Sequence, residues 1–277
     1  MGSWIKDGNF THYHEYSWDS GKEALEDIDI GYKGLVLVDS DFILYPTAFS
    51  SICKQGYEAA QEAAISKLEH YLSSVELEDC RVIQFFTGKG SPKYRDQFYK
   101  NVPYKANRTR PGAPIPQYVD EIKMALASKS TTVFCDPAVG EADDYISIFA
   151  RASWIHRFAA AHVIGSDKDL LQIPSVNHRK GMGELRNTHE SNLFLYRQIL
   201  MGDQADNIPG LKGCGPKRAQ TIIPDSVTEE EEMFSRVCKE YFRCHGGTED
   251  EVTDYLFETA NLLYLRRDFN DYWNPPV

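Results

Sequence analysis

Acidic residues recur along the chain in short, ordered groups, and side chains of this type can bind divalent cations. Magnesium and manganese prefer oxygen ligands, so a site lined by carboxylates suits them. Two such ions about 4 Å apart can hold both the attacking and the leaving oxygen of a phosphodiester. The spacing therefore indicates metal-assisted hydrolysis as one chemistry open to this chain. The candidate ligands are Asp39, Glu141, Asp143, Asp144, Asp167, Asp169, Asp203 and Asp206.

Each acid also has an ordinary structural explanation. Glu141 and Asp144 lie where a helix is expected to begin, so helix capping and the helix dipole account for either residue taken alone. Asp167 could be an N-cap or turn residue, and Asp203 a loop residue. Asp143, in contrast, continues the apolar stripe of its helix, which faces the expected sheet.

Strands and helices alternate in the part of the chain that carries most of these acids. This alternation predicts an α/β fold with a mostly parallel central sheet flanked by helices. Ligand sites of such sheets lie beyond the carboxyl ends of the strands, and Asp39 and Asp167 each follow such an end. Strand signals stop after Met201, so residues 201–277 are expected to be all-helical. The expected strands are 35–38, 82–86, 132–134 and 162–164, and the expected helices are 58–75, 117–127 and 145–152.

A glycine-rich stretch, Gly210–Ala219, could hold a phosphate. Its glycines allow a tight turn and close backbone approach, and Pro216 suits the first position of a helix. The free amides at a helix start attract anions. A plain Gly-Pro turn between helices is the alternative. The candidate DNA-binding residues are Lys212, Gly213, Gly215, Lys217 and Arg218.

A second basic stretch, Lys93–Arg110, interleaves tyrosines with lysines and arginines. Basic residues follow phosphates, and aromatic rings can stack on unpaired bases. A solvated loop explains the segment equally well. The candidate nucleic-acid contacts are Arg95, Tyr104, Lys105 and Arg108.

The composition limits the remaining possibilities. The net charge of −11 argues against a protein that coats nucleic acid through bulk charge. The six cysteines form no CxxC pair, which favours free thiols in a reducing compartment, and we expect a cytoplasmic protein (host cytoplasm if viral). The first residues carry no long apolar run, so neither a signal peptide nor a membrane partner is expected. Residues 1–33 are polar and aromatic with no clear period.

Together these motifs resemble the flap endonuclease or 5′-nuclease family, which includes bacteriophage 5′–3′ exonucleases and the 5′-nuclease domain of bacterial DNA polymerase I. The resemblance covers roughly residues 34–223 and is greatest to short phage exonucleases. One matching motif alone is weak evidence, but five motifs in the order of the family are specific evidence for the resemblance. The matching pieces are LVLVDSD, YKANR, GEADD, IGSDKDLLQI and MGDQADNIPGLKGCGPKRA.

The resemblance implies an N-terminal extension (1–33), a PIN-like nuclease domain (34–200) with an arch segment at 88–120, and a helix–three-turn–helix region (201–277). It implies a two-metal Mg²⁺ or Mn²⁺ site held by the eight acids, with Lys105, Arg108, Asp39 and Asp143 in catalysis. Lys105 and Arg108 would contact the reacting phosphate at the base of the arch. K⁺ can also bind the helix–three-turn–helix element in relatives. The implied substrate is DNA with 5′ ends, flaps or RNA primers, and the implied state is a monomer.

One position departs from the family pattern. The family places an aspartate just after the second strand, and this chain has Gly88 there. The missing ligand would belong with Asp39, Glu141 and Asp143. A water, Asp41 or Thr87 could replace it, or the metal could be weakly held. The rival functions are therefore a DNA-binding protein with an impaired nuclease centre and a PIN-type ribonuclease.

Overall fold

The computed structural model describes residues 3–7, 10–16, 34–75, 80–90, 93–100, 103–108, 115–155, 161–179 and 183–276. The chain divides into two compact units. The first comprises Met1–Pro92 and Pro114–Arg186, and the second comprises Lys93–Ala113 and Asn187–Val277.

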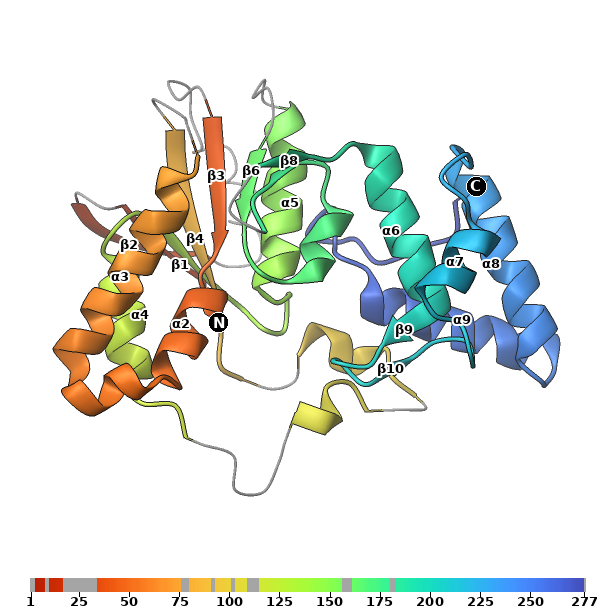
Figure 1. The fold of residues 1–277 in the computed structure, drawn as a ribbon, viewed down its shortest axis with the longest axis horizontal. Helices are drawn as coiled ribbons and strands as arrows, with labels where there is room; N and C mark the ends of the chain where they lie inside the picture. Colours follow the sequence, from red (N-terminus) through yellow and green to blue (C-terminus); the bar gives the residue numbers. More distant parts are fainter. Residues whose placement is uncertain are drawn as a thin grey trace. The chain divides into compact units, whose positions relative to one another are not determined.

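The first unit is built on a sheet that has eight strands in the described residues, in the order β2-β1-β5-β4-β3-β6-β7-β8. The pairs from β5 through β7 are parallel, whereas β1, β2 and β8 pair antiparallel (Figure 1). The predicted mostly parallel sheet is therefore confirmed. The strands are β3 (Gly34–Asp39), β4 (Cys80–Thr87), β5 (Thr131–Cys135), β6 (Ala161–Ile164), β7 (Val176–Asn177) and β8 (Glu184–Leu185).

Helices cover both faces of this sheet. On one face, Val36, Val38 and Phe86 pack with buried residues of α2 (Asp41–Ala48), α3 (Tyr57–Ser73) and α4 (Val119–Ala127). On the other face lies α5 (Ala142–Ile155), where the rings of Phe85 and Phe149 meet edge to face at 5.1 Å. Successive side chains of a strand point to opposite faces. Burial of both faces explains why the central strands are continuous apolar runs. The remaining short helices are η1 (Ser51–Gln55) and η4 (Lys168–Gln172).

Two strands form in the N-terminal segment, where the sequence shows no clear period. β1 (Ser3–Asp7) and β2 (Phe10–Tyr16) pair antiparallel, and β1 adds to β5 with Ile5 opposite Val133. Antiparallel strands at a sheet edge do not need the continuous apolar run of a buried parallel strand. This physical difference explains why the apolar-run criterion did not find them.

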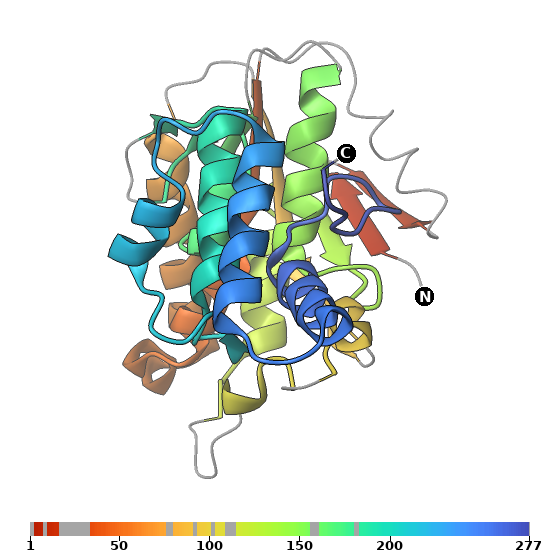
Figure 2. The ribbon, with the colours of Figure 1, turned by 90° about the vertical axis from the view of Figure 1, so that its right-hand side faces the viewer.

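The second unit is a helical assembly of α6 (Thr188–Met201), α7 (Pro216–Ile222), α8 (Glu230–Cys244) and α9 (Glu249–Leu263). Figure 2 shows α6 and α8 side by side, and the hydroxyl of Tyr241 on α8 donates to the carbonyl of Ile199 on α6 at 2.7 Å. A two-residue strand pair, β9 (Gly202–Asp203) and β10 (Ile208–Pro209), interrupts the expected all-helical region. The short helices η2 (Tyr94–Gln97) and η3 (Ala106–Arg108) belong to this unit.

Capping residues fix where two of these helices begin. Asn187 and Glu190 form a reciprocal capping box at the start of α6, and Thr248 and Glu251 form another at α9. All six cysteines are free thiols. Within the ranges that the structure describes, no helix combines the length and apolar character needed to cross a membrane.

Candidate active site

The carboxyl end of β3 brings two acids to the edge of the sheet. Asp39 is the last residue of β3, and the backbone N–H of Asp41 donates to its Oδ1 at 3.2 Å. Ser40, between them, is anchored to the neighbouring strand because its N–H donates to the carbonyl of Phe85 at 3.0 Å. Its hydroxyl also donates to Oε1 of Gln84 at 3.0 Å. The parallel pairing of β3 and β4 therefore holds Asp39 and Asp41 beside the end of β4.

The start of α5 contributes a second group of acids. Glu141 is 7% exposed and Asp144 is fully buried. Oδ2 of Asp144 accepts the backbone N–H of Glu141 at 3.0 Å, and Oδ1 of Asp143 accepts the N–H of Asp144 at 2.8 Å. The capping explanation thus describes a contact that Asp144 does make. The apolar stripe pointed to Asp143 as the sheet-facing acid, yet Asp144 is the more buried of the two.

Thr87 links these two groups at the end of β4. Its backbone N–H donates to Oδ2 of Asp41 at 3.0 Å. Its Oγ1 accepts the N–H of Ala142, the first residue of α5, at 3.1 Å. One residue at the end of β4 therefore ties the start of α2 to the start of α5.

Gly88 follows Thr87 and is tightly enclosed. Its N–H donates to the carbonyl of Cys135 at 3.0 Å. A Cβ on Gly88 would lie 2.3 Å from that carbonyl oxygen and 2.9 Å from Cδ of Pro137. The backbone as it stands has no room for any side chain at the position where the family pattern has an aspartate.

Four acids of the first unit lie close enough to Cys135, the last residue of β5, to act on its thiol. Burial raises the pKa of the Cys135 thiol well above its usual value, and nearby carboxylates raise this pKa further. No three acids among the described residues of the first unit bring carboxylate oxygens within 4.8 Å of one another. The acids near Cys135 therefore contact one another in pairs but form no cluster of three. The carboxylates that act on Cys135 are those of Asp41, Asp143, Asp39 and Asp144.

Asp41 itself lies in an unusual environment. Burial raises the pKa of its carboxyl group, whereas hydrogen bonds from Thr87 and the ammonium of Lys123 act in the opposite direction. Lys123 lies on α4, and burial lowers the pKa of its ammonium. Its Nζ lies 5.6 Å from the ring centre of Phe86. Nothing in the sequence pattern of α4 had singled out Lys123.

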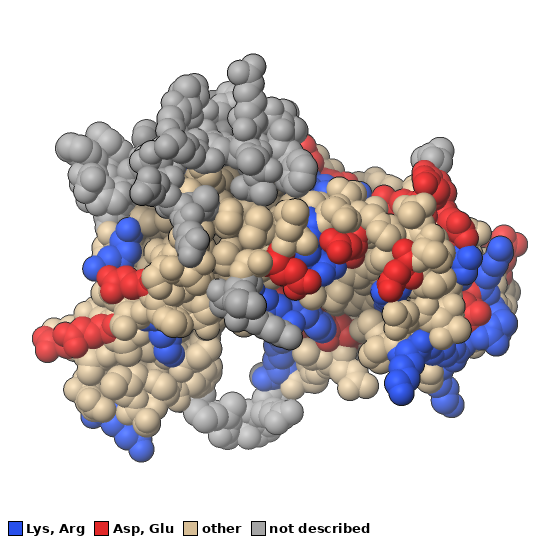
Figure 3. All heavy atoms as spheres, turned by 45° about the horizontal axis from the view of Figure 1, so that its top comes forward, with Lys and Arg blue, Asp and Glu red and all other residues tan. Residues whose placement is uncertain are grey.

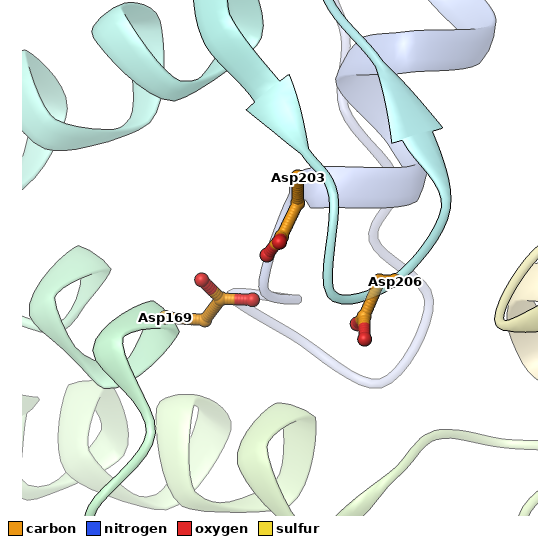
Figure 4. Close-up of side chains that lie close together, drawn as sticks. All are labelled: Asp169, Asp203 and Asp206. Carbon is orange, nitrogen blue, oxygen red and sulfur yellow. The ribbon is translucent and has the colours of Figure 1, made fainter. Parts of the chain in front are cut away.

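The loop after β6 carries the next pair of acids. Asp167 is exposed, and its Oδ1 accepts the N–H of Asp169 at 2.9 Å, which is the N-cap contact of η4. Asp169 is 8% exposed, and Nζ of Lys168 lies 3.2 Å from its Oδ1 (Asp169 is labelled in Figure 4). A Cβ on Gly165 would lie 3.2 Å from Cβ of Asp39. The end of β6 therefore lies directly beside Asp39.

In the second unit, Asp203 and Asp206 lie in the turn between β9 and β10 (Figure 4). Both are buried, at 6% and 7% exposure. Oδ1 of Asp203 accepts the N–H of Ala205 at 2.9 Å, so Asp203 also shapes the turn. The loop-residue explanation given for Asp203 therefore matches one of its contacts.

Three residues of the basic segment in the second unit contact the carboxylate of Asp206. Nη2 of Arg108 forms an ion pair with Oδ1 of Asp206. Nζ of Lys105 lies 3.8 Å from Oδ2, and the hydroxyl of Tyr104 donates to the same oxygen at 3.3 Å. The backbone N–H of Lys105, whose φ is +56°, donates to the carbonyl of Asp206 at 2.8 Å. The two predicted phosphate contacts therefore both engage one predicted metal ligand.

Arg95 lies in a different environment from the other basic candidates. It is 3% exposed, and its guanidinium donates to the carbonyls of Leu262 and Tyr264 at 3.1 and 3.2 Å. Its Cζ lies 6.0 Å from the ring centre of Tyr104. Arg95 therefore fastens the basic segment to the end of α9.

The glycine-rich stretch surrounds a pocket of about 660 Å³, lined by Met201, Gln204 and residues 207–215. Gly213 has φ +72°, a conformation that favours glycine. Gly215 is the N-cap of α7 and Pro216 its first residue. Arg218 donates to the carbonyl of Lys212 at 3.4 Å and to Glu240 at 3.1 Å.

Lys212 and Lys217 are both exposed. On the face drawn in Figure 3, basic and acidic side chains are interspersed, and several basic side chains gather at the lower right. Positive charge on that face is therefore local, in a chain whose net charge is −11.

The family model for the 5′-3′ exonuclease, N-terminal resolvase-like domain, matches residues 34–193. The chain belongs to this 5′-3′ exonuclease family. A 5′-3′ exonuclease of Bacillus subtilis is 26% identical over 215 residues, covering 70% of this chain and 71% of the relative. One from Mycoplasma pneumoniae is 31% identical over 161 residues, covering 52% of this chain and 53% of the relative, so the match spans about half of that protein.

A solved structure supports the fold. The bacteriophage T5 D15 flap endonuclease, in a complex with DNA and metal ions, has a TM-score of 0.55 and 18% identity. The match covers 83% of this chain and 88% of the T5 protein. The 5′-3′ exonuclease family match includes every predicted acid up to Asp169, whereas Asp203 and Asp206 lie beyond it.

Proposed function

We propose that this member of the 5′-3′ exonuclease family hydrolyses phosphodiesters near the 5′ ends of DNA or RNA–DNA duplexes, during replication or recombination. The observation that carries the proposal is the grouping of acids at the strand ends, where Thr87 ties Asp41, beside Asp39, to the start of α5. Buried Glu141 and Asp144 lie at that start. Burial of several acids in one place costs free energy unless something offsets their charge. Divalent cations do so, and the family match supports the nuclease assignment.

The donor chemistry fits Mg²⁺ or Mn²⁺ because every candidate ligand offers oxygen. When bound, such ions supply a water of lowered pKa and offset charge on the leaving oxygen. The crystallisation of the T5 flap endonuclease with DNA and metal ions supports this proposal for the present chain. The residues proposed to hold the metals are Asp39, Glu141, Asp143, Asp144, Asp167, Asp169, Asp203 and Asp206.

Two basic side chains would bind the reacting phosphate. Lys105 and Arg108 already bind the carboxylate of Asp206, so their charges are directed at an anionic oxygen. In the proposed reaction they stabilise negative charge that develops on the phosphate. Tyr104 is proposed as a neighbouring nucleic-acid contact, and buried Arg95 contributes by positioning Tyr104.

We propose that the glycine-rich stretch binds the duplex backbone. Exposed Lys212 and Lys217 supply charge, and Gly213 and Gly215 allow the phosphate close to the main chain. Arg218, held by Glu240, braces the carbonyl of Lys212. The pocket of about 660 Å³ beside these glycines is the proposed place for K⁺.

The domain proposal follows the family pattern. Residues 34–200 form the PIN-like nuclease domain, 88–120 the arch segment and 201–277 the helix–three-turn–helix region, with 1–33 as an extension. We propose that the protein works as a monomer in the cytoplasm, where its free thiols stay reduced.

A cleavage assay tests the proposal. A duplex with a 5′ flap, labelled at its 5′ end, is incubated with the protein with and without Mg²⁺ or Mn²⁺. We expect short labelled products only with metal, and their loss in Asp143→Asn. Lys54→Ala, an exposed substitution outside the proposed site, should cleave normally. Tight binding of the flap duplex without cleavage in either metal would favour the DNA-binding rival. Preference for single-stranded RNA would favour the ribonuclease.

A further inference from the structure

No side chain at position 88 can supply the metal ligand that this chain lacks there. A Cβ there would lie 2.3 Å from the carbonyl oxygen of Cys135. Contacts this short to backbone atoms cannot be relieved by rotating a side chain. If the metal between Asp39, Glu141 and Asp143 is held fully, its additional ligand must come from a residue other than Gly88 or from a water.

Asp41 supplies a carboxylate beside the same strand end. Its Oδ2 accepts the N–H of Thr87, the residue directly before Gly88, at 3.0 Å. Its own N–H donates to Oδ1 of Asp39 at 3.2 Å. The charge of Glu141 also acts on the Asp41 carboxyl group. Asp41 thus lies among the acids with which the missing ligand would belong.

The second oxygen of Asp41 points to a ligand. Oδ1 is buried and has no hydrogen-bond partner among the described residues. An unpaired buried carboxylate oxygen costs free energy, because it has lost water and gained no donor. The ammonium of Lys123 is nearby but forms no hydrogen bond or ion pair with Asp41. A cation at Oδ1 would remove this cost.

Thr87 is the weaker candidate for the same role. Its Oγ1 accepts the N–H of Ala142 at 3.1 Å and also hydrogen-bonds to Asp41. Its hydroxyl is therefore already used in joining α2 to α5. Coordination by Thr87 would require breaking at least one of these bonds, whereas Oδ1 of Asp41 has none to break.

We propose that Asp41, on the first turn of α2, replaces the strand-end carboxylate that this chain lacks at Gly88 and coordinates the divalent metal through Oδ1. This inference rests on the proposed metal-dependent function. It moves one metal ligand from the end of β4 to the start of α2. The competing explanation is that Asp41 only complements the helix dipole at the start of α2.

The test is Mn²⁺ binding by the full chain without substrate. Titration calorimetry and the Mn²⁺ electron paramagnetic resonance signal both measure the binding. Asp41→Asn keeps an oxygen acceptor for Thr87 but removes the charge. We expect it to weaken binding at the tighter site by more than about tenfold. The metal-free protein should melt at or above the wild-type temperature, because a buried charge has been removed. Asp41→Ala provides a second variant with the same expected loss.

Two controls separate the possible failures. Asp120→Asn alters an exposed acid on α4 and should bind Mn²⁺ as the wild type does. Asp39→Asn should lose affinity under either account of Asp41. If the wild type binds no Mn²⁺, the proposed function and this inference both fail. If wild type binds and Asp39→Asn does not, but folded Asp41→Asn binds normally, only the assignment of Asp41 is overturned.

Discussion

The guanidinium of Arg108 forms an ion pair with the carboxylate of Asp206 in the turn between β9 and β10. This contact joins a residue proposed to bind the reacting phosphate to one proposed to bind metal. The side chain of Arg108 is 53% exposed, whereas that of Asp206 is 11% exposed. The arginine can therefore leave the pair at little cost, since its own side chain is half exposed and Lys105 and Tyr104 stay with the carboxylate.

Arg108→Ala should consequently separate catalysis from stability. We expect single-turnover cleavage of a flap duplex to fall by about 100-fold or more, as for loss of one charge-stabilising donor. The free energy of unfolding should change by less than about 1 kcal/mol. Arg108→Lys keeps the charge but loses the planar fork, so its rate should be intermediate. Wild-type cleavage by Arg108→Ala would rule out the proposed phosphate contact.

Gly88→Asp should not repair the site. Overpacking typically costs about 1–3 kcal/mol, and the contact of 2.3 Å with the Cys135 carbonyl involves backbone. We expect Gly88→Asp and Gly88→Ala to be destabilised alike in urea unfolding, without a gain in Mn²⁺ affinity. Gly246→Ala, which has open space around its Cβ, is the matched control. A stable Gly88→Asp protein with tighter metal binding would contradict this description of the strand end.

A histidine pair predicts a pH-dependent stability. Nδ1 of His162 lies 2.8 Å from Nε2 of His178, and the rings stack. Burial, and then the neighbouring His178, lower the pKa of His162 from 6.5 to about 4. Between these values the unfolded chain binds more protons than the folded one. The stabilisation is therefore present above about 6.5 and is lost as the pH falls toward 4.

Urea unfolding across that pH range measures the effect. The difference in unfolding free energy between wild type and His162→Gln should shrink as the pH falls. Comparison of the two proteins removes the contribution of carboxylates that titrate in the same range. His70→Gln, on the exposed side of α3, should follow the wild type at every pH. A pH-independent difference for His162→Gln would refute the role of the pair.

Arg95 should matter for stability more than for DNA contact. Arg95→Ala removes hydrogen bonds from a buried guanidinium to the carbonyls of Leu262 and Tyr264. We expect a loss of about 3 kcal/mol in the free energy of unfolding. Lys100→Ala, whose ion pair with Asp254 is exposed, should change stability by less than about 0.5 kcal/mol. Equal melting temperatures for Arg95→Ala and Lys100→Ala would show that the buried contacts contribute little.

The local sequence pattern was sufficient to predict the strands of the central sheet. The strands around Val36 and Ile83 are buried on both faces, so their apolar runs carry an unambiguous signal. The antiparallel strands β1 and β2, of which β2 forms the edge of the sheet, have no such signal. The relative burial of Asp143 and Asp144 depends on where the helix begins and on the loop beneath it, which periodicity does not specify.

The geometry at the ends of β3 and β4 could not be predicted from the sequence, because it depends on contacts between different strands. The absence of an aspartate at Gly88 could be recognised in the sequence, but its steric cause involves Cys135 and Pro137 on another strand and its loop. Asp41 was one of three open replacements. Its unpaired Oδ1 becomes apparent only once β3 and β4 are placed in register.

The most direct measurement of the central claim is single-turnover cleavage of one flap duplex prepared in two forms, labelled at the 5′ end of the flap strand or at its 3′ end. We expect metal-dependent release of short fragments from the 5′-labelled form, with long complementary fragments from the 3′-labelled form. Short 3′-labelled fragments, or product formation that survives removal of divalent metal, would contradict a metal-dependent 5′-nuclease.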